Sequence, residues 1–172
     1  MYARKRNTSI TMRHENFRKD PFGEITNMFD PAQPSIAVAF VVDSQGRLLL
    51  AWNNKWGAFT LPMTKLQSDQ PAETPEQAGV RAAAEVLGVP TRVVPGKVAQ
   101  FARSLQRSPR DGDIKDYQYN VVPVEPHPDF ASHISSQPFV WAAINKLQAG
   151  EYQPVSKSVD ALLHECVEWA WI

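Results

Sequence analysis

Two apolar runs near the start of the chain predict a pair of buried strands. Residues 36–42 form a nearly continuous apolar run, residues 43–46 (Asp-Ser-Gln-Gly) have the composition of a turn, and residues 47–52 are again mostly apolar. Because the first run shows no polar alternation, we expect it in the middle of a sheet with both faces covered. The pattern predicts a hairpin, followed by an irregular segment over residues 53–73, which one glycine and two prolines interrupt.

The next segment has the start and stop signals of an amphipathic helix over residues 75–87. Thr74 is a good N-cap, Pro75 suits the first helical position, and Gln77 completes a Thr-x-x-Gln capping box. Gly88 fits the left-handed position that ends a helix. These signals predict both ends of the helix.

The remaining pattern alternates strands, loops and one further helix. Apolar segments predict strands over residues 92–105 and 117–124, separated by a polar loop over residues 106–116, and a further strand over residues 139–143. Ser156 is expected to cap a last helix, in which apolar residues recur at helical spacing. Strands and helices mixed in this way, with hairpins instead of repeated strand–helix–strand units, predict an α/β fold with layers around a mixed sheet.

The length and charge distribution are those of one domain with a basic arm. The chain has 172 residues, of which 43% are hydrophobic, enough to build a core. Residues 1–20 carry six basic and two acidic side chains (+4), whereas the rest carries twelve basic and sixteen acidic ones (−4). We therefore predict a basic, flexible extension over residues 1–20 and one domain over residues 21–172. A transit peptide, or an arm that contacts RNA or lipid, is an alternative interpretation of the extension.

Composition also excludes several classes of site and partner. No window approaches about eighteen consecutive apolar residues, which excludes a membrane-spanning helix. A formal net charge of zero argues against a globally basic nucleic-acid binder, so no specific nucleic-acid partner is predicted. The single cysteine, Cys166, excludes an internal disulfide and a cysteine-based zinc site, and we expect it to be buried on the apolar face of the last helix. The default expectation is a cytoplasmic protein, with a homodimer left open.

The spacing of charged residues around the first helix resembles the signature of the Nudix hydrolase superfamily. In that signature a Glu and seven residues precede Arg-Glu-apolar-x-Glu-Glu-x-Gly-apolar. Here Glu73 is followed by seven residues and then Arg81, and Glu85 and Gly88 stand at their expected offsets. The Leu-Pro pair that precedes Met63 is also typical, and the resemblance covers most of residues 35–170. It implies a Nudix-like α/β/α sandwich around a mixed β-sheet.

The chain departs from the signature where the family binds metal. Ala82 and Val86 replace two of the three helix glutamates, so the box is degenerate and only Glu85 remains. Met63-Thr64 replaces the usual glycine pair, and the loop before Glu73 is three residues longer than usual. Positions 82, 85 and 86 share one helix face, so these replacements turn an acidic face largely apolar. The alternative interpretation is that positions 82 and 86 are packing positions of an amphipathic helix.

One carboxylate is still compatible with a divalent ion. Mg²⁺ often takes one or two protein carboxylates, while substrate phosphates and water complete its octahedron. The resemblance therefore implies Mg²⁺ or Mn²⁺ at Glu85 when substrate is present. Chemistry with several metal ions would need further acids, for which the candidates are Asp111, Asp113, Asp116 and Glu125.

The resemblance and the residue chemistry together give the candidate site. The candidate catalytic residues are Glu85, which is also the metal ligand, and Arg81 and Glu73, which by resemblance form a buried or half-buried pair. The candidate substrate-binding residues are aromatic side chains for a nucleobase and cations for phosphates: Trp52, Trp56, Lys65 and Arg103. The alternative for the aromatic residues is packing in the core or in a loop.

Two functions follow from these residues. The first is a divergent Nudix hydrolase with a weakened metal site, which acts on a nucleoside diphosphate linked to another moiety. The second is a catalytically inactive Nudix-fold module that binds a nucleotide-like small molecule or a protein partner. Loss of the acidic face favours the second function, while retention of Glu85 and of the Arg81 spacing favours the first.

Overall fold

The computed structural model describes residues 36–68, 71–107, 112–127 and 138–172. The predicted basic extension, and the start of the predicted domain at residue 21, lie outside the described residues. No helix of the described part is long and apolar enough to cross a membrane.

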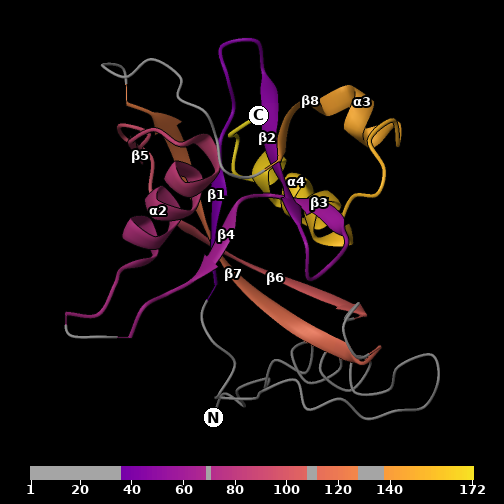
Figure 1. Ribbon diagram of the computed structural model, residues 1–172, viewed down its shortest axis with the longest axis horizontal. Helices are drawn as coiled ribbons and strands as arrows, with labels where there is room; N and C mark the ends of the chain where they lie inside the picture. Colours follow the sequence, from indigo (N-terminus) through magenta and orange to yellow (C-terminus); the bar gives the residue numbers. More distant parts are fainter. Residues whose placement is uncertain (1–35, 69–70, 108–111, 128–137) are drawn as a thin grey trace, which may run out of the picture.

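The described strands form two sheets (Figure 1). In the larger, mixed sheet, β1 lies between β4 and β7, parallel to β7 and antiparallel to β4, while β7 also pairs with β5 and β6. Its strands are β1 (Ile36–Phe40), β4 (Met63–Lys65), β5 (Thr91–Val93), β6 (Gln100–Arg107) and β7 (Ile114–Pro126). In the smaller sheet, β2 lies between two antiparallel neighbours. Its strands are β2 (Arg47–Asn53), β3 (Ala58–Thr60) and β8 (Phe139–Ala143).

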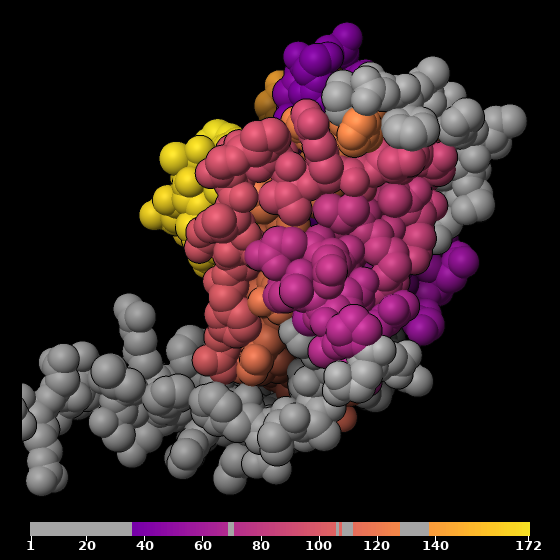
Figure 2. Space-filling model, turned by 90° about the vertical axis from the view of Figure 1, so that its left-hand side faces the viewer, coloured from indigo at the N-terminus to yellow at the C-terminus, as the bar shows by residue number. Residues whose placement is uncertain are grey.

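Helices cover these sheets on both sides, which makes the fold an α/β/α sandwich around a mixed β-sheet, as predicted. Helix α2 (Pro75–Leu87) packs on one side with apolar residues of β1, β2 and β7. On the other side, α3 (Ile144–Gln148) and α4 (Lys157–Glu168) pack on the opposite faces of the same strands. Figure 2 faces the α2 side, where the magenta surface that includes this helix fills the centre of the view.

The capping signals of α2 are confirmed. The Thr74 hydroxyl accepts a hydrogen bond from the Gln77 amide (3.3 Å), and the Gln77 side chain accepts one from the Thr74 amide (2.9 Å). Gly88 follows the helix with a φ of 69°, a conformation that costs glycine little. The last helix is also confirmed, with Ser156 as its N-cap and Cys166 fully buried. Burial raises the pKa of the Cys166 thiol to about 12.

The predicted hairpin is correct at its turn and wrong beyond it. The Asp43 carboxylate accepts hydrogen bonds from the Gln45 and Arg47 amides, and a single bridge joins Val42 to Leu48. The two strands then enter different sheets, because both edges of β1 are taken by β4 and β7 from later in the chain. β1 does lie inside its sheet, and residues 37–41 are buried as expected.

Three predicted boundaries are wrong because tertiary pairing overrides weak local signals. Residues 53–73 are not wholly irregular, since they include β3 and β4. The strand predicted over residues 92–105 is two strands, interrupted near Gly96, which has a φ of 76°. The loop predicted over residues 106–116 is shorter, because β6 and β7 extend into it from both sides along their pairing. The short helix α3 was not predicted.

Candidate active site

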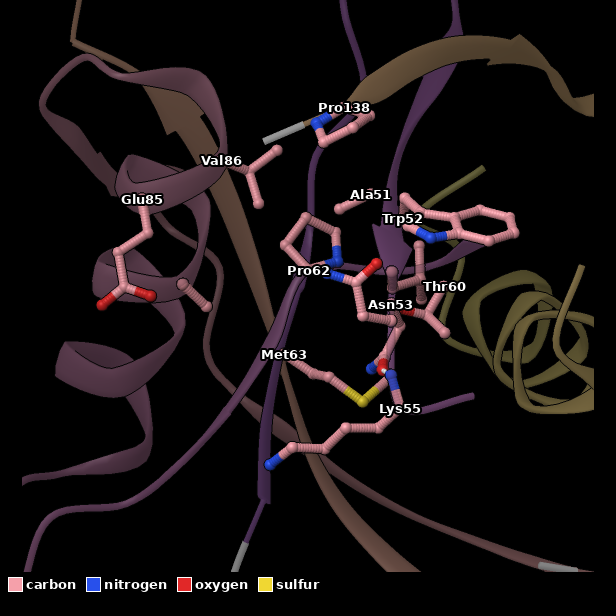
Figure 3. Close-up of a pocket in the computed structure, with 13 residues that line it drawn as sticks. Ala51, Trp52, Asn53, Lys55, Thr60, Pro62, Met63, Glu85, Val86 and Pro138 are labelled. Carbon is pink, nitrogen blue, oxygen red and sulfur yellow. Dashed lines mark hydrogen bonds between the residues drawn. The ribbon is translucent and has the colours of Figure 1, made fainter. Parts of the chain in front are cut away.

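A cleft of about 410 Å³ lies between α2 and the turn that joins β2 to β3, a volume typical of small-molecule sites (Figure 3). The segment between β3 and β4 and the start of β8 complete its walls. The cleft is lined by Ala51, Trp52, Asn53, Asn54, Lys55, Thr60, Leu61, Pro62, Met63, Ala82, Glu85, Val86 and Pro138.

The α2 wall of this cleft is the helix face formed by positions 82, 85 and 86, which are all glutamate in the Nudix signature. Ala82 and Val86 are only 3% and 4% exposed, because they pack with apolar residues of β1, β2 and β7. Between them the Glu85 side chain retains 52% exposure. In Figure 3 Val86 points into the cleft, while Glu85 extends from the outer side of the helix. Among the described lining residues, Glu85 is the one carboxylate.

Arg81 ties α2 to the loop before it. Its guanidinium donates to both oxygens of Glu73, with Nε–Oε1 at 2.9 Å and Nη2–Oε2 at 2.8 Å. The resemblance implied this pair, and it is half-buried, with side-chain exposures of 28% for Arg81 and 12% for Glu73. A bidentate pair of this kind fixes orientation as well as charge.

The same guanidinium also reaches β4 and the cleft carboxylate. Nη1 donates to the Thr64 hydroxyl (3.0 Å) and to Glu85 Oε1 (3.3 Å), and Nη2 donates to the Lys65 carbonyl (3.1 Å). Arg81 therefore holds together the loop, the strand and the helix that border the cleft. Its contact with Glu85 gives that side chain a defined position.

Glu73 is held in its charged form by these contacts. Hydrogen bonds from Arg81, and then from the Gln67 amide, lower the pKa of Glu73 against the opposing effect of burial. The same partner raises the pKa of Arg81. A carboxyl with a depressed folded-state pKa stabilises the fold above its unfolded pKa of about 4.3, and this contribution is lost as the pH falls through the folded value.

We therefore expect the free energy of unfolding of Glu73→Gln to fall less steeply with decreasing pH than that of the wild type. The wild-type protein should lose stability below about pH 4.3 partly through protonation of Glu73. The variant should be less stable at pH 7 and should approach the wild type as the pH falls. Urea unfolding midpoints between pH 7 and pH 3 test this, with Glu76→Gln as the control on the same helix. A wild-type-minus-variant difference that is constant with pH would contradict the expectation.

The opposite wall of the cleft is a tight turn that sequence reasoning missed. The Asn53 side chain accepts hydrogen bonds from the Lys55 amide (3.0 Å) and the Trp56 amide (3.2 Å). Gly57 follows with a φ of 59°. The turn places Lys55 on the cleft wall, and among the described lining residues this is the one cationic side chain. The sequence signal for this turn was the Asn-Asn-Lys-Trp-Gly composition, which is typical of a turn.

Of the four predicted substrate-binding residues, Trp52 is one of the described lining residues of the cleft, and the other three are not. The Trp52 ring makes an edge contact with Phe59, at a centroid distance of 5.2 Å. Trp56 instead contacts Tyr117 (5.8 Å) on the neighbouring sheet.

The two predicted phosphate-binding cations are absent from the cleft lining. Lys65 contributes its carbonyl to Arg81. Arg103, on β6, forms an ion pair with Asp116 on β7. Both were predicted because a cation can bind phosphate, whereas the pairing of β6 with β7 places Arg103 against Asp116.

The further acids proposed for a multi-metal site are likewise elsewhere. Asp116 is buried against Arg103, and Glu125 pairs with Arg92 at 2.7 Å. Asp111 lies outside the described residues. Within the part of the chain that the structure describes, no group of three or more His, Cys, Asp or Glu side chains could hold a metal ion. Glu85 is therefore the carboxylate on which a cleft metal would depend.

Comparisons with known proteins identify the fold. No family model and no curated protein sequence matches the chain. A Nudix hydrolase from M. Smegmatis, RenU, superposes with a TM-score of 0.53 at 19% identity, over 87% of this chain and 92% of that one. A UDP-X diphosphatase gives 0.53 at 14%, over 94% and 69% of the two chains. A C. elegans Ap4A hydrolase gives 0.51 at 14%, over 81% and 100%. At these identities the similarity establishes the architecture: the chain has the Nudix fold.

Proposed function

We propose that the protein is a divergent Nudix-type hydrolase that acts slowly on a nucleoside diphosphate linked to another moiety. The observation that carries the proposal is the position of Glu85, a half-exposed carboxylate on the α2 wall of the cleft. The ligand class is supported by the structural neighbours, which include a UDP-X diphosphatase and an Ap4A hydrolase.

Among the described residues that line the cleft, the single carboxylate fits one divalent ion. Glu85 accepts from Arg81 through one oxygen, Oε1, and would hold Mg²⁺ or Mn²⁺ together with the phosphates of the ligand. When bound, such an ion neutralises charge on phosphate and activates water. Ala82 and Val86 offer no oxygen ligand, which is why we expect slow turnover.

The roles of Arg81 and Glu73 in this proposal are those of positioning residues. Arg81 contacts Glu85, and Glu73 holds Arg81 with two hydrogen bonds. Together they orient the carboxylate and the loop beside it. The sequence-based assignment of both residues as catalytic is refined accordingly.

We expect Glu85→Gln to lower metal-dependent kcat/KM by at least about tenfold, because an amide is a far weaker ligand for a hard cation than a carboxylate. ADP-ribose, UDP-sugars and diadenosine tetraphosphate, with Mg²⁺ or Mn²⁺, form the substrate panel, and release of phosphate-containing products is measured. Glu76→Gln on the same helix is the matched control and should retain activity. Equal turnover by wild type and Glu85→Gln would contradict the metal role of Glu85.

A specific observation also favours the second candidate, a catalytically inactive module that binds a nucleotide-like ligand. The α2 wall is packed with Ala82 and Val86, whose burial is that of core residues. An absence of turnover across the panel, combined with ligand binding that Glu85→Gln leaves unchanged, would support the module and reject the hydrolase.

A further inference from the structure

We infer that Lys55 anchors the diphosphate group of the ligand, and that the ligand binds in the cleft without a divalent metal. The inference rests on the ligand class of the proposed function, a nucleoside diphosphate derivative, and goes beyond it by assigning the anion-binding residue. It also separates binding, which depends on Lys55, from turnover, which depends on Glu85.

The charges of the cleft favour a protein cation over a metal as the partner of the phosphates. A helix face with three carboxylates repels a diphosphate and needs divalent ions to bridge the two. Here Ala82 and Val86 remove two of those charges, so one acid and one base, Glu85 and Lys55, remain among the described lining residues. The compact ammonium group of a lysine is a suitable point charge for phosphate oxygens.

The Lys55 side chain has no ion-pair partner in the described part of the chain and is available to bind an anion. It differs in this from Arg81 and Arg103, which are engaged by Glu73 and Asp116. The backbone that carries it is fixed, because its own amide donates to the Asn53 side chain. A fixed backbone lowers the entropy that is lost when the ammonium group binds a ligand.

The Lys55 side chain is directed toward the α2 side of the cleft. In Figure 3 the side chain extends from the β2–β3 turn, past Met63, toward the side on which α2 lies. Trp52 also belongs to the cleft lining, but its ring lies against Phe59 at a centroid distance of 5.2 Å and points away from α2 in Figure 3. The feature that this wall offers to a nucleoside diphosphate is therefore the cation, which suits its phosphates.

Isothermal titration calorimetry with ADP, UDP and inorganic pyrophosphate tests the inference, in EDTA and in Mg²⁺. For the tightest of the three probes, we expect Kd values in the two buffers to agree within about threefold. Lys55→Ala should weaken binding by at least about tenfold, since a hydrogen bond to a charged group is lost. Lys55→Arg should restore most of the affinity, and added salt should weaken binding by the wild type more than by Lys55→Ala.

Lys157→Ala, on the exposed start of α4, is the matched control and should bind like the wild type. The inference is overturned if no probe binds in EDTA, or if Lys55→Ala binds as tightly as the wild type. Its failure is distinguishable from that of the proposed function. Metal-free binding that needs Lys55, in a protein without turnover, retains the inference and rejects the hydrolase. Turnover that needs Glu85 but not Lys55 retains the hydrolase and rejects the inference.

Discussion

Replacing Arg81 with alanine is expected to lower the free energy of unfolding by about 3 kcal/mol and to weaken ligand binding in the cleft. The substitution removes the bidentate pair with Glu73 and leaves that carboxylate, which is only 12% exposed, without its main partner. It also removes the contacts to Thr64 and Lys65 that join α2 to β4. Breaking a partly buried pair costs more than its net strength, because one charge stays desolvated.

Urea unfolding followed by circular dichroism measures this loss, and Arg92→Ala is the matched control. Arg92 pairs with Glu125 on a more exposed surface, with side-chain exposures of 44% and 33%, so its removal should cost no more than about 1 kcal/mol. Arg81→Lys should recover only part of the loss, since one ammonium group cannot form the two parallel bonds. Similar losses for Arg81→Ala and Arg92→Ala would refute the role of Arg81 in joining these elements.

Replacing Gly79 with alanine is expected to destabilise the protein by about 2–3 kcal/mol, against the usual trend for a helix. In an exposed helix, alanine is favoured over glycine by about 1 kcal/mol. Here a Cβ at position 79 would lie 2.6 Å from Val122 Cβ and 2.7 Å from Val122 Cγ2, on the strand β7 beneath the helix. Relieving that overlap requires α2 to move away from the sheet, at the cost of core packing.

A double-mutant cycle with Val122→Ala isolates this contact. Val122→Ala alone should cost about 2 kcal/mol, because it leaves a cavity under α2. The double variant should be more stable than the sum of the two losses implies, but only in part, because Val122→Ala removes Cγ1 and Cγ2 and keeps the Cβ that lies 2.6 Å from the new methyl group. Thermal unfolding measures all four proteins. A rise in melting temperature for Gly79→Ala, or strict additivity of the two losses, would show that the helix does not rest closely on β7.

The close approach at Gly79 also matters for the cleft. Gly79 stands two positions before Arg81 and three before Ala82, so the depth at which α2 sits on β7 sets the position of the cleft wall. Ala82 and Val86 can pack against β1, β2 and β7 because the helix lies close to the sheet there. Because alanine and valine carry no side-chain oxygen, Glu85 is the carboxylate that this helix face presents among the described lining residues of the cleft.

Local signals predicted the parts of the structure that depend on near neighbours in the chain. The boundaries of α2 follow from Thr74, Gln77 and Gly88, whose caps form within a few residues of themselves. The pairing of Glu73 with Arg81 was implied by the resemblance to the Nudix signature, and the structure contains this pair. The Nudix-like sandwich was predictable from the same residues together with the order of strands and helices.

The amino-acid sequence by itself therefore determined helices α2 and α4, the turn at Asp43, the α/β/α class and the reduction of the acidic helix face to Glu85. Only the tertiary structure decided which sheet each strand joins, that Arg103 pairs with Asp116, and that Lys55 is the one cation among the described lining residues of the cleft. The physical reason is range: caps and turns are made by residues a few positions apart, whereas the cleft is assembled by pairing of strands that lie far apart in the chain.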